Sequence, residues 1–183
     1  IFSGIFFYLL LNEIFKKKTI AILGTIFYLY YPFRMVDLYV RGSVGESLVF
    51  AILPLVYWSL YRRWLGISGL SIALLILAHN SLALVSLPFV FFFMVFNLIL
   101  KRKKQKSLLH CYMVALLIGF GLSCFFWLPA LYEKQWTILR PEIITKPIEH
   151  FPSLRQLIIP QIRSSLSFQL GSIHLILAAA GIL

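Results

Sequence analysis

Charged residues, and acids in particular, are scarce in this chain of 183 residues. Only 13% of the residues are charged, with six Asp or Glu against 17 Lys or Arg, and 61% are hydrophobic. Soluble domains have about 25% charged and about 45–50% apolar residues. A soluble domain of this length has too little interior to bury so much apolar surface. The composition therefore excludes a soluble enzyme domain and a disordered segment, and it predicts an integral membrane protein.

The sequence also lacks the short motifs that carry common enzyme chemistry. It contains no Walker loop, no G-x-S-x-G motif and no G-x-G-x-x-G motif. Its two cysteines, Cys111 and Cys124, fall on one predicted helix about 20 Å apart, which is too far for a disulfide. No two of its four histidines have the local spacing of zinc ligands. The sequence therefore supports metal chemistry only weakly, and it gives no basis for a hydrolase, a kinase or a dehydrogenase.

The net charge of +11 does not indicate a nucleic-acid-binding protein. The basic residues form short clusters between apolar runs, at 16–18, 62–63 and 101–106, and do not line one face. Lys and Arg concentrate in the short cytoplasmic loops of multi-pass membrane proteins. We therefore expect a lipid bilayer as the partner, and no nucleic acid.

The number of membrane crossings between the basic clusters predicts the topology, and we call this the parity argument. A spanning helix needs about 20 apolar residues, and an even number of crossings must separate any two cytoplasmic clusters. Runs 19–33 and 47–61 lie between the first two clusters, and run 65–100 is long enough for two helices that turn at 79–81. Run 107–132 then leaves the cytoplasmic side and the chain re-enters at 171. The fold class predicted is an all-α bundle of about seven membrane segments.

The first and last segments look truncated, so we expect residues 1–183 to be a single transmembrane-domain fragment of a longer chain. The predicted cytoplasmic side has ten Lys or Arg and one acid, Glu13, whereas the outer side has seven Lys or Arg and five acids. The outer segments are 34–46, 79–81 and the long loop 133–170 of a multi-pass cell-membrane protein. Acid chemistry, if present, therefore lies on the extracytoplasmic side.

The first outer segment is the main candidate site. If 34–41 is helical, Arg34, Asp37 and Arg41 share one face, and Asp37 lies between two guanidinium groups that could hold a phosphate. The alternative is an interfacial helix stabilised by a salt bridge. Glu46 lies three residues after Ser43 and before an apolar run, which is the pattern of a helix-capping box. Asp37 and Glu46 are thus candidate catalytic acids, with capping as the alternative role of Glu46.

The second candidate is the predicted turn at His79 and Asn80. These side chains could donate hydrogen bonds to a ligand, and the alternative is a polar turn in which Asn80 caps the next helix. The loop 133–170 has four prolines, so it is not one helix. It is a candidate lid or substrate platform, or else a plain connecting loop.

The run from Tyr28 to Glu46 reads Y-x-Y-x-P-F-R-x-x-D-x-Y-V-R-G-x-x-x-E and resembles a bacterial membrane family described as 6-pyruvoyl-tetrahydropterin-synthase-related. The resemblance extends to further segments along nearly the whole chain: 54–55, 79–80, 123–133, 150–151, 156–158 and 167–171. The stretch 157–166 is shorter than is usual in that family. The zinc-binding histidines of the soluble synthase are absent.

The resemblance implies a GT-C-like glycosyltransferase that transfers a sugar from a polyprenyl-phosphate donor to a cell-envelope acceptor on the outer face. It implies that Arg34, Arg41, His79, Asn80 and His150 bind substrate. Asp37 or Glu46 would accept a proton or position a divalent cation, whose requirement stays open. The other class is a non-enzymatic membrane transporter or scaffold for lipid-linked saccharides.

The topology is tested with single cysteines in a variant that lacks Cys111 and Cys124. A cysteine at position 80 or in 133–170 should react with a membrane-impermeant reagent applied from outside. Cysteines beside Lys17, Arg62 and Lys104 should not react, because their loops are predicted to be cytoplasmic. Outside labelling beside Lys104 would overturn the predicted orientation.

Overall fold

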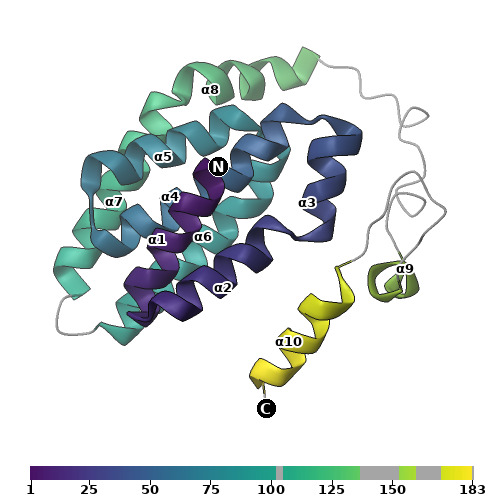
Figure 1. The fold of residues 1–183 in the computed structure, drawn as a ribbon. Coiled ribbons are helices and arrows are strands. Elements are labelled where there is room, and N and C mark those ends of the chain that lie inside the picture. Colours follow the sequence, from purple (N-terminus) through teal and green to yellow (C-terminus); the bar gives the residue numbers. More distant parts are fainter. Residues whose placement is uncertain (102–104, 137–152, 160–169, 183) are drawn as a thin grey trace.

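All the secondary structure of the described residues is helical. The computed structural model describes residues 1–101, 105–136, 153–159 and 170–182, and these contain no strand. The helices are α1 (Phe2–Phe15), α2 (Lys18–Leu29), α3 (Pro32–Val36), the π-helical turn η1 (Asp37–Arg41), α4 (Val44–Arg62), α5 (Leu65–Ala78), α6 (Asn80–Leu100), α7 (Gln105–Leu122), α8 (Cys124–Glu133), the 3₁₀ turn η3 (Lys134–Trp136), α9 (Leu154–Ile158) and α10 (Ser172–Ile182). The predicted all-α membrane helix bundle is confirmed, and Figure 1 shows its arrangement.

Helix length separates two kinds of membrane segment. In the described residues α4, α6 and α7 are long and apolar enough to cross a bilayer, and α2 with 32–41 forms a fourth such segment that bends by 49°. The other apolar helices of the bundle, α1 and α5, have 14 residues each. At 1.5 Å per residue such a helix is about 21 Å long, shorter than a hydrocarbon core of about 30 Å. Of the roughly seven predicted membrane segments, three or four are thus long enough to span a bilayer in the described residues, and α1 and α5 are shorter apolar helices.

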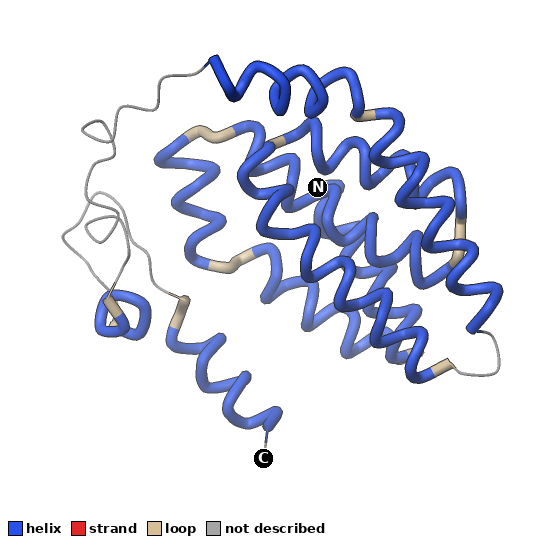
Figure 2. Tube along the Cα trace, turned by 180° about the vertical axis from the view of Figure 1, so that it is seen from behind, coloured by secondary structure: helices blue, strands red, loops and turns tan. Residues whose placement is uncertain are grey.

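The predicted helix boundaries are partly right. The run 65–100 forms two helices that turn at His79, as expected, and Figure 2 shows the short connections of the bundle from behind. The expected single helix 107–132 is instead α7 and α8, which meet at Ser123. The Ser123 hydroxyl donates to the Gly119 carbonyl oxygen at 2.8 Å. This back-bond to the preceding turn is a known cause of helix bending.

The bundle core lies between α4, α5, α6 and α7. Val56, Leu60, Ile72 and Leu75 are fully buried there, and Val90 of α6 joins them. Large apolar side chains on the outside stay exposed, among them several phenylalanines of α6: Phe89, Phe91, Phe92 and Phe96. An apolar exterior around a packed interior is expected where lipid, and not water, surrounds the helices.

Helices α5 and α7 pack closely together, and two glycines face each other there. A Cβ atom added to Gly69 would lie 2.5 Å from Ile118, and one added to Gly119 would lie 2.5 Å from Ile72. Small residues allow membrane helices to approach closely and gain van der Waals contact. Gly66 and Gly121 lie on the same two helices but have open space around them.

The charged residues gather at two ends of the bundle. At the basic end, Arg62 lies 3.2 Å from Glu13, which also binds Lys16 at 2.7 Å. Lys101 lies over the ring of Tyr61 at 4.0 Å from its centroid. The three basic clusters thus meet at one end, as the parity argument requires, and 37–46 and the turn at His79 lie at the other. Which side of the membrane each end faces stays a prediction.

The helices after the bundle are short. Helix α9 lies within the predicted loop 133–170, and its Ser153 and Gln156 form a capping box. Most of the predicted loop 133–170 lies outside the described residues, so its role as a lid is untested. The last helix, α10, packs beside α2 through His174, which is hydrogen-bonded to the carbonyl oxygen of Phe27 at 3.0 Å.

The glycine contact between α5 and α7 gives a stability prediction. Gly69→Ala and Gly119→Ala should each lower the free energy of unfolding by about 1–3 kcal/mol, because the added methyl group has no space. Gly66→Ala and Gly121→Ala are the matched controls and should leave stability unchanged or raise it by up to about 1 kcal/mol. Unfolding by SDS in mixed micelles measures all four variants. Equal effects at the crowded and open positions would contradict the close packing.

Candidate functional site

The backbone of the candidate site is a short helical segment that changes type at Asp37. Pro32 starts α3 at a position where its missing N–H costs nothing. From Asp37 the helix widens into the π turn η1, and Gly42 ends it with a left-handed φ of 62°. Single π turns occur often at functional sites. Gly42 is thus needed for its backbone conformation, since nothing lies within 4 Å of an added Cβ atom.

Three charged side chains meet where η1 joins α4. The Arg41 guanidinium donates to both carboxylate oxygens of Glu46, at 2.9 and 2.7 Å. The same group lies 3.2 Å from a carboxylate oxygen of Asp37. The side chains of Arg41, Glu46 and Asp37 are 40%, 10% and 0% exposed. We call these three residues the acid–arginine cluster.

Asp37 is the unusual member of this cluster. It is fully buried, and neither of its carboxylate oxygens has a hydrogen-bond partner among the described residues. A buried carboxylate without hydrogen bonds costs several kcal/mol unless a charge or a proton compensates it. Ionisable groups at membrane depth are rare and mark functional sites by default. Asp37 is therefore the residue whose placement most needs a functional explanation.

The expected capping box of α4 is wrong. Ser43 does occupy the N-cap position, but its side chain makes no capping hydrogen bond. Glu46 binds Arg41 instead, because a bidentate pair with a guanidinium is stronger than a neutral cap.

The expected face that joins Arg34, Asp37 and Arg41 is also wrong in part. Arg34 turns toward α1 and donates to the Ser3 hydroxyl at 2.5 Å. Its guanidinium lies 5.5 and 5.7 Å from the ring centroids of Tyr28 and Phe50. The helix is not a regular α-helix through 34–41, so its predicted register does not hold. Asp37 lies beside Arg41 and Glu46, and not between two arginines.

His79 is placed next to the acid–arginine cluster by a glycine. A Cβ atom added to Gly45 would lie 2.8 Å from the Ala78 carbonyl oxygen and 3.3 Å from the His79 ring. Because glycine has no side chain, Gly45 at the start of α4 can contact the end of α5. Gly45 is the residue directly before Glu46. His79 Nδ1 accepts from the Leu82 N–H at 3.3 Å and so caps α6. The expected cap was Asn80.

Asn80 faces a different region from its neighbour His79. Its side-chain oxygen accepts from the Ser81 N–H at 2.7 Å, and both residues line a groove of about 410 Å³ between α6, α7 and α8. The remaining predicted binding residue, His150, lies outside the described residues. In the described part of the chain no group of three or more His, Cys, Asp or Glu side chains is arranged to hold a metal ion.

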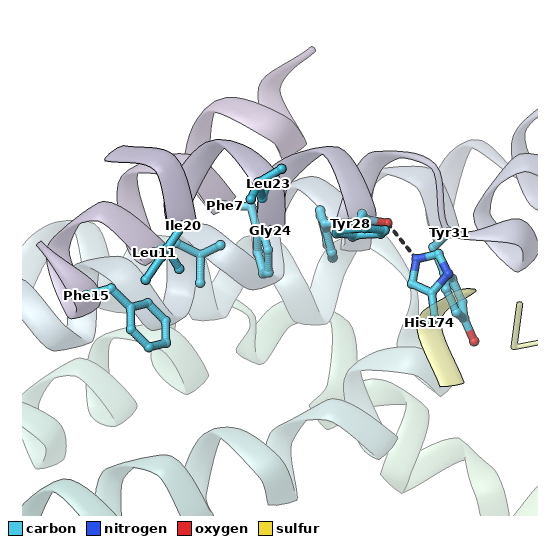
Figure 3. A pocket seen from close by; sticks show the side chains of 10 residues that line it. Phe7, Leu11, Phe15, Ile20, Leu23, Gly24, Tyr28, Tyr31 and His174 are labelled. Carbon is cyan, nitrogen blue, oxygen red and sulfur yellow. Dashed lines mark hydrogen bonds between the residues drawn. The ribbon is translucent and has the colours of Figure 1, made fainter. Parts of the chain in front are cut away.

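A second groove runs along α1 and α2 and is almost entirely apolar. Figure 3 shows its length, from Phe15 at one end past Gly24 to Tyr31 and His174 at the other. Its volume is about 490 Å³. The ring of His174 packs edge-on against Phe27 and Tyr31. A groove of this kind fits an apolar chain or helix, and it offers few polar groups for chemistry.

Sequence reasoning did not assign three of the residues that shape these regions. Ser3 binds Arg34 from 31 positions away, and no local pattern links them. His174 joins α10 to α2, which only the packing decides. Trp127 lines the groove at Asn80, and the signals that could have found it are its aromatic-rich helix and the family resemblance of segment 123–133.

Comparison with known proteins gives one result. The family model described as 6-pyruvoyl-tetrahydropterin synthase related domain, a membrane protein, matches residues 2–182. The chain belongs to this family. No curated protein and no solved structure matches the chain. The resemblance seen in the 28–46 motif is thus confirmed at the level of the synthase-related membrane family, and within it the acid–arginine cluster is built from motif residues.

The cluster of this synthase-related protein makes a stability prediction. Arg41→Ala should lower the free energy of unfolding by about 3 kcal/mol, because it leaves the buried Asp37 and Glu46 carboxylates without their partner. Arg62→Ala is the matched control, because Arg62 is 44% exposed and its partner Glu13 is 23% exposed, and it should cost less than about 1 kcal/mol. SDS unfolding in mixed micelles measures both variants.

The double variant Arg41→Ala with Asp37→Asn checks the cause of that loss. Removing the uncompensated charge should recover a large part of the stability. Equal losses for Arg41→Ala and Arg62→Ala would show that the acid–arginine cluster is not an important stabilising contact.

Proposed function

We propose that this chain is part of a membrane-embedded glycosyltransferase. It transfers a sugar from a polyprenyl-phosphate donor to a cell-envelope acceptor at the end of the bundle that carries the acid–arginine cluster. The observation that carries the proposal is Asp37, a fully buried acid beside Glu46. Its two oxygens have no hydrogen-bond partner among the described residues, and one of them forms an ion pair with Arg41 at 3.2 Å. The family resemblance supplies the reaction class, and the buried acids supply groups that such a reaction needs.

The two acids are proposed to have different roles in sugar transfer, and one of them accepts a proton. In sugar transfer the acceptor hydroxyl oxygen forms a bond to the anomeric carbon of the donor. The bond from that carbon to the lipid phosphate breaks, and the electron pair leaves with the phosphate oxygen. The hydroxyl proton must go to a base, and a positioned carboxylate contributes about 10²–10⁴-fold to such a step. Glu46 is the proposed base because it is the more exposed acid.

Asp37 then has a positioning role. Arg41 has two carboxylate partners, so it stays paired with Asp37 when Glu46 takes up a proton and weakens its own bond. A guanidinium has five N–H donors, and Arg41 uses two of them on Glu46. The remaining donors of this partly exposed side chain are proposed to bind the phosphate of the donor.

The charge of the cluster bears on the cofactor. One arginine and two acids give it no positive excess, so a phosphate needs further compensation. Arg34, which points toward α1, would need to turn to supply it. A divalent cation that takes oxygen ligands from Asp37, Glu46 and the phosphate would provide it equally well. His79 adjoins the cluster and is proposed as a hydrogen-bond donor to the substrate, and His150 is proposed as a further binding residue.

A non-enzymatic transporter or scaffold for lipid-linked saccharides is the second candidate. The observation that favours it is the closed bidentate pair of Arg41 and Glu46, which ties η1 to the start of α4. A salt bridge of this kind can stabilise a loop without taking part in a reaction. The two functions differ in whether Glu46 must carry a charge.

The proposal predicts an activity loss for one carboxylate and not for its control. Cells without the intact gene are complemented with the full-length protein, as wild type, Glu46→Gln or Glu13→Gln. Glu13 pairs with Lys16 and Arg62 at the basic end and is the matched control. Glu46→Gln should slow the transfer at least 100-fold, so that the lipid-linked sugar donor accumulates as in cells without the gene. Glu13→Gln should restore the normal profile.

Two outcomes would contradict the enzyme. An active Glu46→Gln variant, in protein that inserts normally, would show that Glu46 takes no part in the reaction. It would favour a purely structural salt bridge between Arg41 and Glu46. A lipid-linked sugar profile that does not change when the gene is removed would exclude the transfer reaction itself.

A further inference from the structure

The groove between α6, α7 and α8 has polar lining residues at one end and apolar lining residues further along. Asn80 and Ser81 line it at the start of α6, and Leu84 and Leu87 follow one and two turns further along the same helix. The distance along the axis from Asn80 to Leu87 is about 10 Å. The groove is therefore polar at the end of the bundle that carries the acid–arginine cluster and apolar toward the middle.

The groove is open along one edge. Leu84 and Leu131 are 74% and 63% exposed, whereas Ala83 behind them is buried. In a bundle surrounded by lipid, this edge opens toward the bilayer. A ligand carried by the membrane can thus enter sideways, with its chain along the leucines and its head group near Asn80 and Ser81.

Trp127 forms an aromatic wall of the groove, and its ring is held in place. Its indole N–H donates to the Phe120 carbonyl oxygen at 3.0 Å, and its ring packs edge-on against that of Phe120. The bend at Ser123 directs α8 so that this contact can form. Since the N–H is already used, the ring offers an apolar surface to a ligand and no donor.

The lining residues also indicate which head group fits. None of the described residues that line the groove is charged, so it has no partner for a phosphate or an ammonium group. The Asn80 side-chain oxygen accepts from the Ser81 N–H and lies 3.3 Å from the Ser81 hydroxyl oxygen, so the Asn80 NH₂ group remains as a donor and the Ser81 hydroxyl oxygen as an acceptor. Such pairs match neighbouring hydroxyl groups, and an aromatic ring matches the apolar face of a sugar. The volume of about 410 Å³ is within the usual range of ligand sites, about 300–1,000 Å³.

We propose that this groove binds a lipid-borne, uncharged glycoside, with its sugar on Trp127 and between Asn80 and Ser81 and its chain along Leu84 and Leu87. Asn80 follows His79, which adjoins the residue before Glu46. The inference rests on the proposed function and makes this ligand the sugar acceptor, while the charged donor binds at the acid–arginine cluster.

Photolabelling of the full-length wild-type protein in phosphatidylcholine nanodiscs tests the site directly. The probe is n-decyl β-D-glucopyranoside with a diazirine in its chain, and the control probe carries the same chain on glycerol. The glucoside should label the peptides of α6 and α8 at least fivefold more than the glycerol probe, and unlabelled decyl glucoside should compete. Equal labelling by the two probes, or labelling mainly of α1 and α2, would overturn the proposal.

Variants then assign the polar and aromatic contacts. Asn80→Ala and Ser81→Ala should each weaken competition by the glucoside about three- to tenfold, which is the range expected for one hydrogen bond. Trp127→Leu should weaken it further, and Trp127→Phe should weaken it less because a ring remains. Ser172→Ala on α10 and Phe92→Leu on the outer face of α6 are the controls. Wild-type competition in all of the groove variants would also overturn the proposal.

The outcomes separate this site from the proposed reaction. Groove labelling with no detectable sugar transfer would support the binding site and contradict the glycosyltransferase. Sugar transfer without groove labelling would contradict the site and leave the reaction standing. Glu46→Gln should still bind the glucoside, because its side chain does not line the groove.

Discussion

The absence of water inside a bilayer is the constraint on which this structure depends. Backbone groups are satisfied within helices, and charged side chains of the bundle are driven to its two ends. At the basic end Glu13 pairs with Lys16 and Arg62, which are partly exposed. At the other end the pairs are more deeply buried. The contrast matters because a charge costs most where it is least exposed, and Asp37 is buried completely.

Glycines determine how close the helices come, and so where the site forms. Gly69 and Gly119 bring α5 and α7 together, which sets the position of the end of α5. Gly45 then lets the start of α4 contact that end, and it places His79 beside the residue before Glu46. The acid–arginine cluster and the turn at His79 are thus neighbours because these three positions are glycines, which have no side chain.

The nearness of the acid–arginine cluster and the groove between α6, α7 and α8 is consistent with the proposed function. A charged region with Arg41 and Glu46 adjoins an uncharged groove with Asn80 and Trp127, and His79 lies between them. A transfer reaction between a charged lipid donor and a neutral lipid-borne acceptor needs two such regions side by side. A salt bridge that only stabilises a loop would account for the ion pairs, but it would give no role to the groove at Asn80 and Trp127.

Four features could be predicted from the amino-acid sequence: the class of protein, the all-helical fold, the turn at His79 and the meeting of the basic clusters at one end. These follow from apolar run lengths and charge positions, which depend on composition along the chain. The partners of the charged side chains could not be predicted and came from the packing of the helices. Arg34 binds Ser3, 31 positions away, and Glu46 binds Arg41 in place of the expected cap. A π turn at Asp37 changes the register of the motif, and partner choice depends on register and helix packing, which local spacing does not encode.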